Sequence, residues 1–164
     1  MMIGELRMFA CGVVLALTMG LGGCITMPDG NSEPDYVMIE FGAVAAFMVI
    51  INETKVTDES VVKAYEGLSA MEEGLLAVVN GSRQMDLTLI DAMFASALPI
   101  EYQALGATGS KLIRSRVSQY LTPEGGSDLP EWMNENSLTA KISLAVVHGA
   151  KAAMEPKYRA ITGN

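Results

Sequence analysis

The sequence predicts an all-α protein, a compact bundle of four to five helices formed by residues 36–164. Apolar residues recur at intervals of three and four along several stretches, which is the spacing of one helix face. No stretch alternates convincingly between apolar and polar residues, as a half-buried strand would. Half of the 164 residues are hydrophobic, which supplies enough apolar side chains for the core of one domain.

The chain begins with an apolar run that ends at a cysteine. Residues 8–19 (MFACGVVLALTM) follow Arg7 and are too few to cross a bilayer comfortably as a helix. Leu21-Gly22-Gly23-Cys24 then gives a branched apolar residue, two small residues and a cysteine. This arrangement resembles the signal peptide and lipobox of a bacterial lipoprotein. Glu5 departs from that pattern, because such a peptide starts with a positively charged segment.

The resemblance implies that residues 1–23 are removed by cleavage between Gly23 and Cys24, and that the thiol of Cys24 carries acyl chains such as palmitate. In this family an aspartate directly after the lipidated cysteine favours retention in the inner membrane. Ile25 stands there instead, which implies the outer membrane, facing the periplasm, if the host has two membranes. The alternative is an uncleaved membrane anchor in which Cys24 has no special role.

Residues 24–35 are expected to form a flexible tether between the anchor and the helical domain. The segment after Cys24 (ITMPDGNSEPD) is rich in proline, glycine, asparagine and aspartate. These residues favour turns and solvated chain. The sequence therefore predicts a body held off the bilayer by a short linker.

The second apolar run, from Val37 to Ile51, allows two interpretations. Only Glu40 is charged within it, and about fifteen residues fall short of the roughly twenty that a membrane-spanning helix needs. A buried central helix is the favoured interpretation. The alternative is a second membrane segment with Glu40 as a functional carboxylate.

Two helices are expected between residues 57 and 98. Thr57 is a good N-cap because two acidic residues follow it in the first turn, and Asn80-Gly81 provides the glycine that commonly ends a helix. Ser82 is the expected cap of the next helix, over about 83–98. That helix is apolar around most of its circumference, which predicts an interior position.

The next stretch contains several helix breakers. Pro99 can start a helix, since its missing N–H is not needed in the first turn. We expect Gly106 and Gly109 to interrupt that helix before an amphipathic segment over 111–121. Residues 122–127 (TPEGGS) predict a loop.

The C-terminal part is expected to hold one short turn and one long helix. Residues 130–133 predict a single turn that lays Trp132 over an end of the core. Ser137 is the expected cap of a last helix that runs to about Met154. Pro156 should end it.

The titratable residues form no recognisable catalytic motif. His148 is the only histidine, which excludes a site built from several histidines, and its neighbours at helical spacing indicate a partly exposed surface residue rather than a catalytic base. Glu66, Glu72 and Glu73 could form an acidic cluster, but only Glu66 and Glu73 share a helix side, so a solvated face is favoured. A serine–histidine–aspartate triad forms only in space, and the sequence leaves it open.

Two further groups of residues are candidate binding sites. Residues 106–111 (GATGSK) have the composition of a phosphate-binding loop, but the glycine spacing is wrong and no strand precedes them, so a helix break is favoured. Lys111 and Arg114, with Ser118, form a small basic face. It is a candidate contact for an acidic partner or lipid headgroups, and an ordinary solvated face is the other interpretation.

Charge and cysteine content limit the function further. One acid and one base lie before Cys24, so residues 24–164 keep the net charge of −8, which would repel both nucleic acid and anionic lipid headgroups. Cys11 and Cys24 are the only cysteines, so a lipidated, processed chain has no thiol for a metal, a disulfide or a nucleophile. We expect no cofactor, no metal and no nucleic-acid partner.

Two function classes follow from these observations. The first is a non-catalytic lipoprotein that acts as an interaction or structural component of the cell envelope and binds an envelope protein. The second is a lipoprotein that binds a small apolar ligand or lipid in a cavity of the bundle. A solid core with exposed apolar surface would favour the first, and an enclosed pocket with convergent polar groups the second. An enzyme is the third choice.

Overall fold

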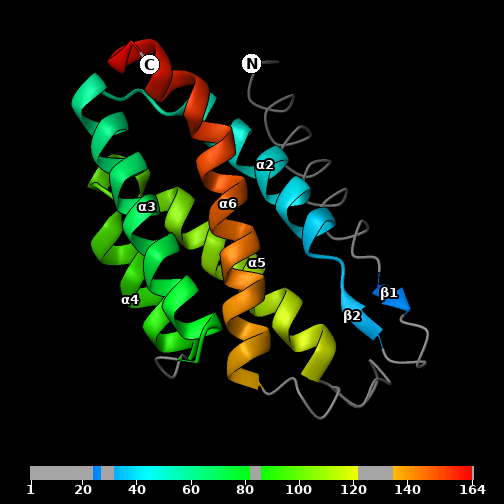
Figure 1. The fold of residues 1–164 in the computed structure, drawn as a ribbon. Helices are drawn as coiled ribbons and strands as arrows, with labels where there is room; N and C mark the ends of the chain where they lie inside the picture. Colours follow the sequence, from blue (N-terminus) through cyan, green and yellow to red (C-terminus); the bar gives the residue numbers. More distant parts are fainter. Residues whose placement is uncertain (1–23, 27–31, 82–85, 122–134, 164) are drawn as a thin grey trace, which may run out of the picture.

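The computed structural model describes residues 24–26, 32–81, 86–121 and 135–163, which form an all-α bundle (Figure 1). The predicted fold class is therefore confirmed. Two three-residue strands, β1 (Cys24–Thr26) and β2 (Ser32–Pro34), pair in antiparallel fashion ahead of the first described helix. The helices are α2 (Tyr36–Glu53), α3 (Asp58–Val79), α4 (Leu87–Ala97), the short 3-10 helix η1 (Ile100–Tyr102), α5 (Gln103–Leu121) and α6 (Glu135–Thr162).

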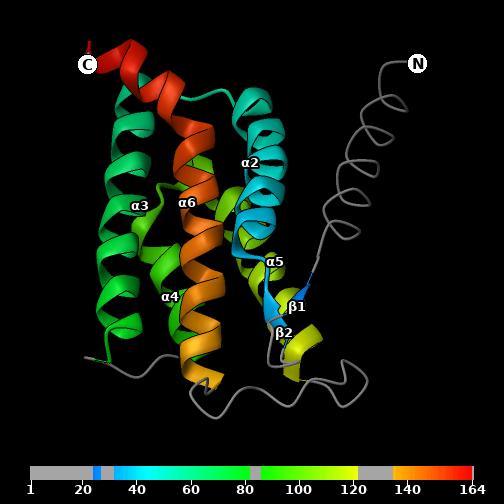
Figure 2. The ribbon, with the colours of Figure 1, turned by 45° about the vertical axis from the view of Figure 1, so that its right-hand side comes forward.

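The central helix is α6. It packs against α2 on one side and α3 on the other, and α5 lies behind it, while α4 packs on α5 and α3. Helices α3, α6 and α2 thus form one layer and α4 and α5 a second (Figures 1 and 2). Helix α6 can be surrounded by other helices because the residues that face them are apolar or small. The fully buried residues of α6 include Leu138, Ile142, Val146, Val147, Ala150 and Met154.

The structure corrects the prediction that residues 37–51 form a buried central helix. Helix α2 lies at the edge of the bundle, and its buried residues, among them Ala43 and Phe47, belong to the face that packs against the other helices. Within the described part of the chain, α2 alone has the length and composition of a membrane span, with a mean hydropathy of 1.6 and a third of its residues buried. Apolar residues of α2 therefore lie both on the face that packs against the bundle and on the face that is open to solvent.

Side-chain caps fix where three helices begin. Asp35, Thr57 and Asp86 each accept a hydrogen bond from the backbone N–H three residues later, at Met38, Ser60 and Leu89. The predicted cap at Thr57 is confirmed. Gly81, at a φ of +80°, follows the C-cap of α3, where a side chain would strain the backbone.

The expected break at two glycines is wrong, because α5 continues through both. Gly106 and Gly109 lie against α4, and a Cβ atom at Gly109 would come within 2.6 Å of the Phe94 ring. Both glycines allow α4 and α5 to approach closely, which outweighs their low helix propensity of about 1 kcal/mol each. Residues 106–111 are helical and form no loop, so they are not a phosphate-binding loop.

The structure also corrects the predicted interior position of α4. Of its residues only Ile90 and Phe94 are buried, and Leu89 is exposed. The sequence predicted an interior helix from its broad apolar surface. Instead α4 covers the outside of α3 and α5 with one face, and the remaining apolar side chains lie at the surface.

The last helix differs from its prediction at both ends. Helix α6 begins at Glu135, so Ser137 lies inside it and is not the cap, and it continues through Pro156 to Thr162. The turns beyond the proline are held by contacts with other helices. Lys157 Nζ donates to the carbonyl of Ile51 at 2.6 Å, and Tyr158 stacks on a tyrosine of α3.

Several predictions fall outside the described residues. They are the signal peptide over 1–23 with the cleavage position at Gly23, the cap at Ser82, the loop over 122–127 and the turn over 130–133 with Trp132.

Candidate polar cluster and contact surfaces

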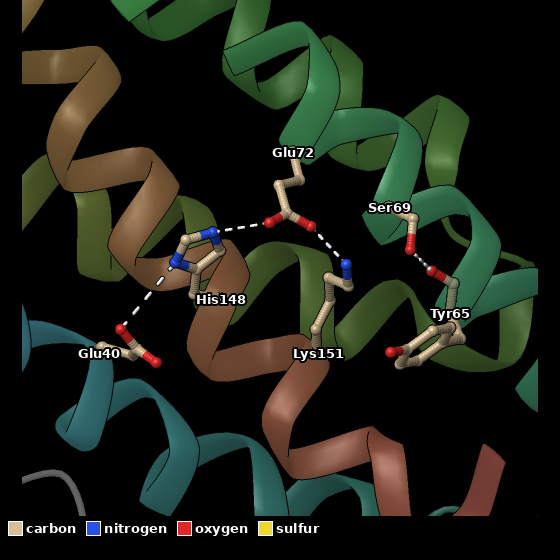
Figure 3. A network of polar contacts seen from close by, with 6 residues as sticks. All are labelled: Glu40, Tyr65, Ser69, Glu72, His148 and Lys151. Atoms are coloured by element: carbon tan, nitrogen blue, oxygen red, sulfur yellow. Dashed lines mark hydrogen bonds and ion pairs between the residues drawn. The ribbon is translucent and has the colours of Figure 1, made fainter. Parts of the chain in front are cut away.

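The most connected polar side chains lie where α6 meets α3 and α2. His148 and Lys151 stand one turn apart on α6, and both reach Glu72 of α3 (Figure 3). His148 Nε2 lies 2.8 Å from Glu72 Oε1, and Lys151 Nζ donates to Glu72 Oε2. On the other side, His148 Nδ1 is 4.0 Å from Oε2 of Glu40 on α2. The polar cluster, defined as Glu40, Glu72, His148 and Lys151, thus links three helices.

Glu72 is ionised over a wider pH range than an isolated glutamate. Partial burial raises its pKa, but the hydrogen bond and charge of Lys151, followed by those of His148, outweigh burial and lower the pKa below its ordinary value. The side chains of Glu72 and Lys151 are both largely shielded from solvent. Their attraction is therefore less screened than that of a surface pair.

Aromatic rings extend the cluster along α3 and α6. The ammonium group of Lys151 lies 5.4 Å from the ring centre of Tyr65, and that ring stacks on Tyr158 with 4.1 Å between centroids and 14° between planes. Lys151 therefore has a carboxylate and an aromatic face as neighbours. Both contacts hold α6 at a fixed rotation relative to α3.

The chemistry open to this cluster is limited. Within the described residues, no set of three histidine, cysteine or acidic side chains could hold a metal ion. Two serines on the same helices are engaged elsewhere: the hydroxyl of Ser69 donates to the Tyr65 carbonyl and that of Ser143 to the Thr139 carbonyl. His148 has two carboxylates as neighbours, those of Glu40 and Glu72.

Sequence reasoning found His148 but missed its partner. His148 is partly exposed, with 36% of its side chain accessible, as expected. Glu72, however, is turned toward α6 and not into solvent. A signal was present: Glu72 lies four residues after Leu68 and three before Leu75, both fully buried, so it borders the apolar stripe of α3. An acid in that position is near the neighbouring helix.

The predicted basic residues lie on α5, away from the contacts of the polar cluster. Arg114 donates to Asp91 and, at 3.5 Å, to the Leu87 carbonyl, so its charge connects α5 with α4. Burial raises the pKa of Asp91, but hydrogen bonds from Ser110 and Arg114 and the charge of Arg114 lower it below the ordinary value. Lys111 is exposed. Of the two predicted contact residues, Lys111 is the one whose charge points outward.

Cys24, the predicted lipidation site, is the first residue of β1. Its backbone faces Pro34 in the strand pair, and Asp35, the next residue, caps α2. Within the segment expected as a flexible tether, the described residues 24–26 and 32–34 pair as antiparallel strands. Strand β1, which begins at Cys24, lies beside β2, and β2 leads into α2 (Figure 2).

Beside that start, α2 exposes an apolar stripe to solvent. The stripe consists of Val37, Phe41, Ala45 and Met48, which follow one another at helical spacing. Val37 is 75% exposed and Phe41 68%. These are large values for apolar side chains, and adjacent exposed apolar residues often mark a contact surface.

Comparison of the chain with family models, curated proteins and solved structures found no match. What the protein does must therefore be argued from its own residues.

Proposed function

We propose that this chain is a lipoprotein of a bacterial cell envelope whose helical body binds another envelope protein and catalyses no reaction. Leu21-Gly22-Gly23-Cys24 supports the anchor, with acyl chains on Cys24. Ile25 in place of an aspartate favours the outer membrane, with the body facing the periplasm. Confinement at a membrane raises the effective concentration of a partner held there, so a modest interface suffices.

The observation that carries this proposal is the location of the apolar surface. Large side chains such as Phe47 and Ile142 are fully buried and fill the space between the helices. Leu76, Leu89 and Ile100 are instead exposed on the outside of the bundle. Large buried side chains with apolar surface outside support an interaction protein over a protein that encloses a ligand. The cleft between α3 and α4, of about 330 Å³ and lined by Gly67, Met71 and Met93 among others, is open to solvent and does not enclose a ligand.

The cleft between α2 and α6 gives little support to an apolar ligand. It measures about 310 Å³, and Glu40, Lys141 and His148 are part of its wall. An apolar ligand there would remove water from these polar groups without replacing their hydrogen bonds, which is unfavourable. The polar cluster is better explained as a link between helices than as a binding or catalytic site.

The anchor is tested by labelling cells with radioactive palmitate. The wild type and Cys11→Ser should incorporate label, and Cys24→Ser should not. Cys11→Ser is the matched control because it removes the other cysteine of the same segment. Equal labelling of the wild type and Cys24→Ser would overturn the anchor.

The absence of catalysis is tested with the cellular phenotype and with crosslinking. His148→Ala and Glu73→Ala should leave the phenotype of the protein nearly intact, and crosslinking in cells followed by mass spectrometry should recover a recurrent envelope protein. If His148→Ala abolished function while the chain stayed folded, anchored and bound to its partner, an enzymatic function would replace this proposal.

A further inference from the structure

The strand pair shortens the distance between the anchor and the helices. Fully extended, the chain from Cys24 to Pro34 would span roughly 35 Å. Facing residues of paired antiparallel strands have Cα atoms only about 5 Å apart, and Cys24 faces Pro34. The backbone of Cys24 therefore lies close to the first turn of α2.

The most exposed side chains at that place are apolar. Val37 and Phe41, the most exposed apolar residues of α2, lie in its first two turns, and Ala45 and Met48 continue the stripe. Glu40 is the only charged residue between positions 36 and 52. Its carboxylate oxygen Oε2 lies 4.0 Å from His148 Nδ1 on α6 (Figure 3).

We propose that the N-terminal half of α2, through Val37 and Phe41, rests on the bilayer that holds the acyl chains of Cys24. The inference rests on the anchor proposed above and specifies how the body is oriented on it. The helix lies on the bilayer and does not cross it, because Ile39, Ala43 and Phe47 on its opposite face are buried in the bundle. Two apolar side chains next to a lipid anchor would enter the boundary between headgroups and acyl chains.

A bilayer suits this stripe better than a protein partner does. A stable protein interface buries about 800 Å² on each side, whereas the stripe is a single row of four side chains. The anchor also keeps lipid next to the stripe, so a protein would have to displace it. The body carries a net charge of −8; because the stripe itself is uncharged, it contacts lipid through apolar burial, and anionic headgroups weaken the contact.

This orientation leaves other apolar surface for the envelope partner. Leu89 on α4 and Ile100 on η1 are exposed, and α4 packs mainly on α5 and α3, in the layer behind α6 and α2 (Figure 2). With α2 on lipid, that side of the bundle stays accessible from the aqueous phase. The matched pair for a test is therefore Phe41 on α2 and Leu89 on α4, two exposed apolar residues.

The experiment places a fluorescent NBD probe at either position of the full chain. Phe41→Cys and Leu89→Cys are made in a Cys11→Ser background, in which Cys24 is the only other cysteine. The protein is purified from membranes and reconstituted into phosphatidylcholine vesicles, with or without phosphatidylglycerol. Quenching by spin-labelled lipid and by aqueous iodide is measured, and the mass of the N-terminal peptide reports acylation of Cys24 separately.

The proposal expects several-fold stronger lipid quenching at position 41 than at 89, the reverse order for iodide, and weaker lipid quenching at 41 when phosphatidylglycerol is present. Replacing Val37 by aspartate should expose the probe at 41 to iodide without changing acylation. Equal iodide quenching at both positions, or a probe at 41 shielded from both quenchers by protein, would overturn the inference. An unacylated Cys24 would instead overturn the proposed anchor.

Discussion

The two sides of α6 are held by different kinds of contact. On the α2 side, small residues let the two helices approach: a Cβ atom at Gly149 would lie 2.6 Å from both the Ala43 Cβ and the Glu40 carbonyl oxygen. On the α3 side, the contacts are ionic and aromatic, from Glu72 to His148 and Lys151 and between stacked tyrosines. The close approach at Gly149 on the α2 side depends on shape, and the link through Glu72 on the α3 side depends on charge.

This difference indicates what each contact responds to. Close packing of small residues changes little with pH or salt, but it tolerates no added atoms. An ion pair tolerates small shifts in geometry but requires the right protonation state. The α2 contact should therefore be broken by volume, and the α3 contact by a change of charge.

The largest expected effect is at Gly149. Gly149→Ala should lower the free energy of unfolding by about 2 kcal/mol, because overpacking costs about 1–3 kcal/mol and more where backbone must move, against a gain of up to about 1 kcal/mol in helix propensity. Urea titration followed by circular dichroism measures the change.

Gly74→Ala is the matched control for this effect. The atom nearest to a Cβ there is the flexible end of Met93, at 3.2 Å. Alanine should be neutral or stabilising at that site by up to about 1 kcal/mol. If the two variants had the same stability, shape would not explain the α2 contact.

The next effect concerns the α3 contact. Glu72→Gln keeps the side-chain shape and removes the charge that Lys151 and His148 share, and it should cost about 1–2 kcal/mol. Glu73→Gln, one residue away and exposed, should stay within about 0.5 kcal/mol of the wild type. Similar losses in both variants would point to a general charge effect rather than to the polar cluster.

The pH dependence of this loss follows from the pKa of Glu72. Because folding lowers that pKa below its ordinary value of 4.5, the stabilisation is fully present above pH 4.5 and is lost as the pH falls through the folded pKa. The difference in unfolding free energy between wild type and Glu72→Gln should shrink below pH 4.5. A difference that stayed constant down to the acid transition would contradict the assigned role of Glu72.

Local rules predicted the helices well where the decisive contact is local. The cap at Thr57 depends on residues only three positions away, and Gly81 on its own backbone angle. The predicted helix break at Gly109 and helix end at Pro156 are wrong. The helix-propensity costs of these residues, about 1 and 3 kcal/mol, are outweighed by contacts with residues far away in sequence. Those contacts are the Phe94 ring and, beyond the proline, the stacking of Tyr158 on α3.

The candidate site was predictable only in part, for a related reason. The exposure of His148 follows from the helical spacing of its neighbours. The link to Glu72 depends on how α3 and α6 are rotated against each other, which is set by the whole core. The position of Glu72 between two buried leucines was the available signal. The apolar content of α2 was evident from the sequence, but its division between a packed face and an open one was not.

The smallest expected effect concerns a second ion pair, which is more exposed to solvent than the pair of Glu72 and Lys151. Arg114 and Asp91 join α5 to α4, as Glu72 and Lys151 join α3 to α6, but about half of each side chain is exposed, at 48% and 44%. Water and salt screen such a pair, so Asp91→Asn should cost no more than about 0.5 kcal/mol, and the loss should vanish in molar salt. The loss in Glu72→Gln should persist there, because the side chains of Glu72 and Lys151 are largely shielded from solvent. Urea titrations of both variants in low and high salt measure this, and a larger loss for Asp91→Asn would show that exposure does not decide the strength of these pairs.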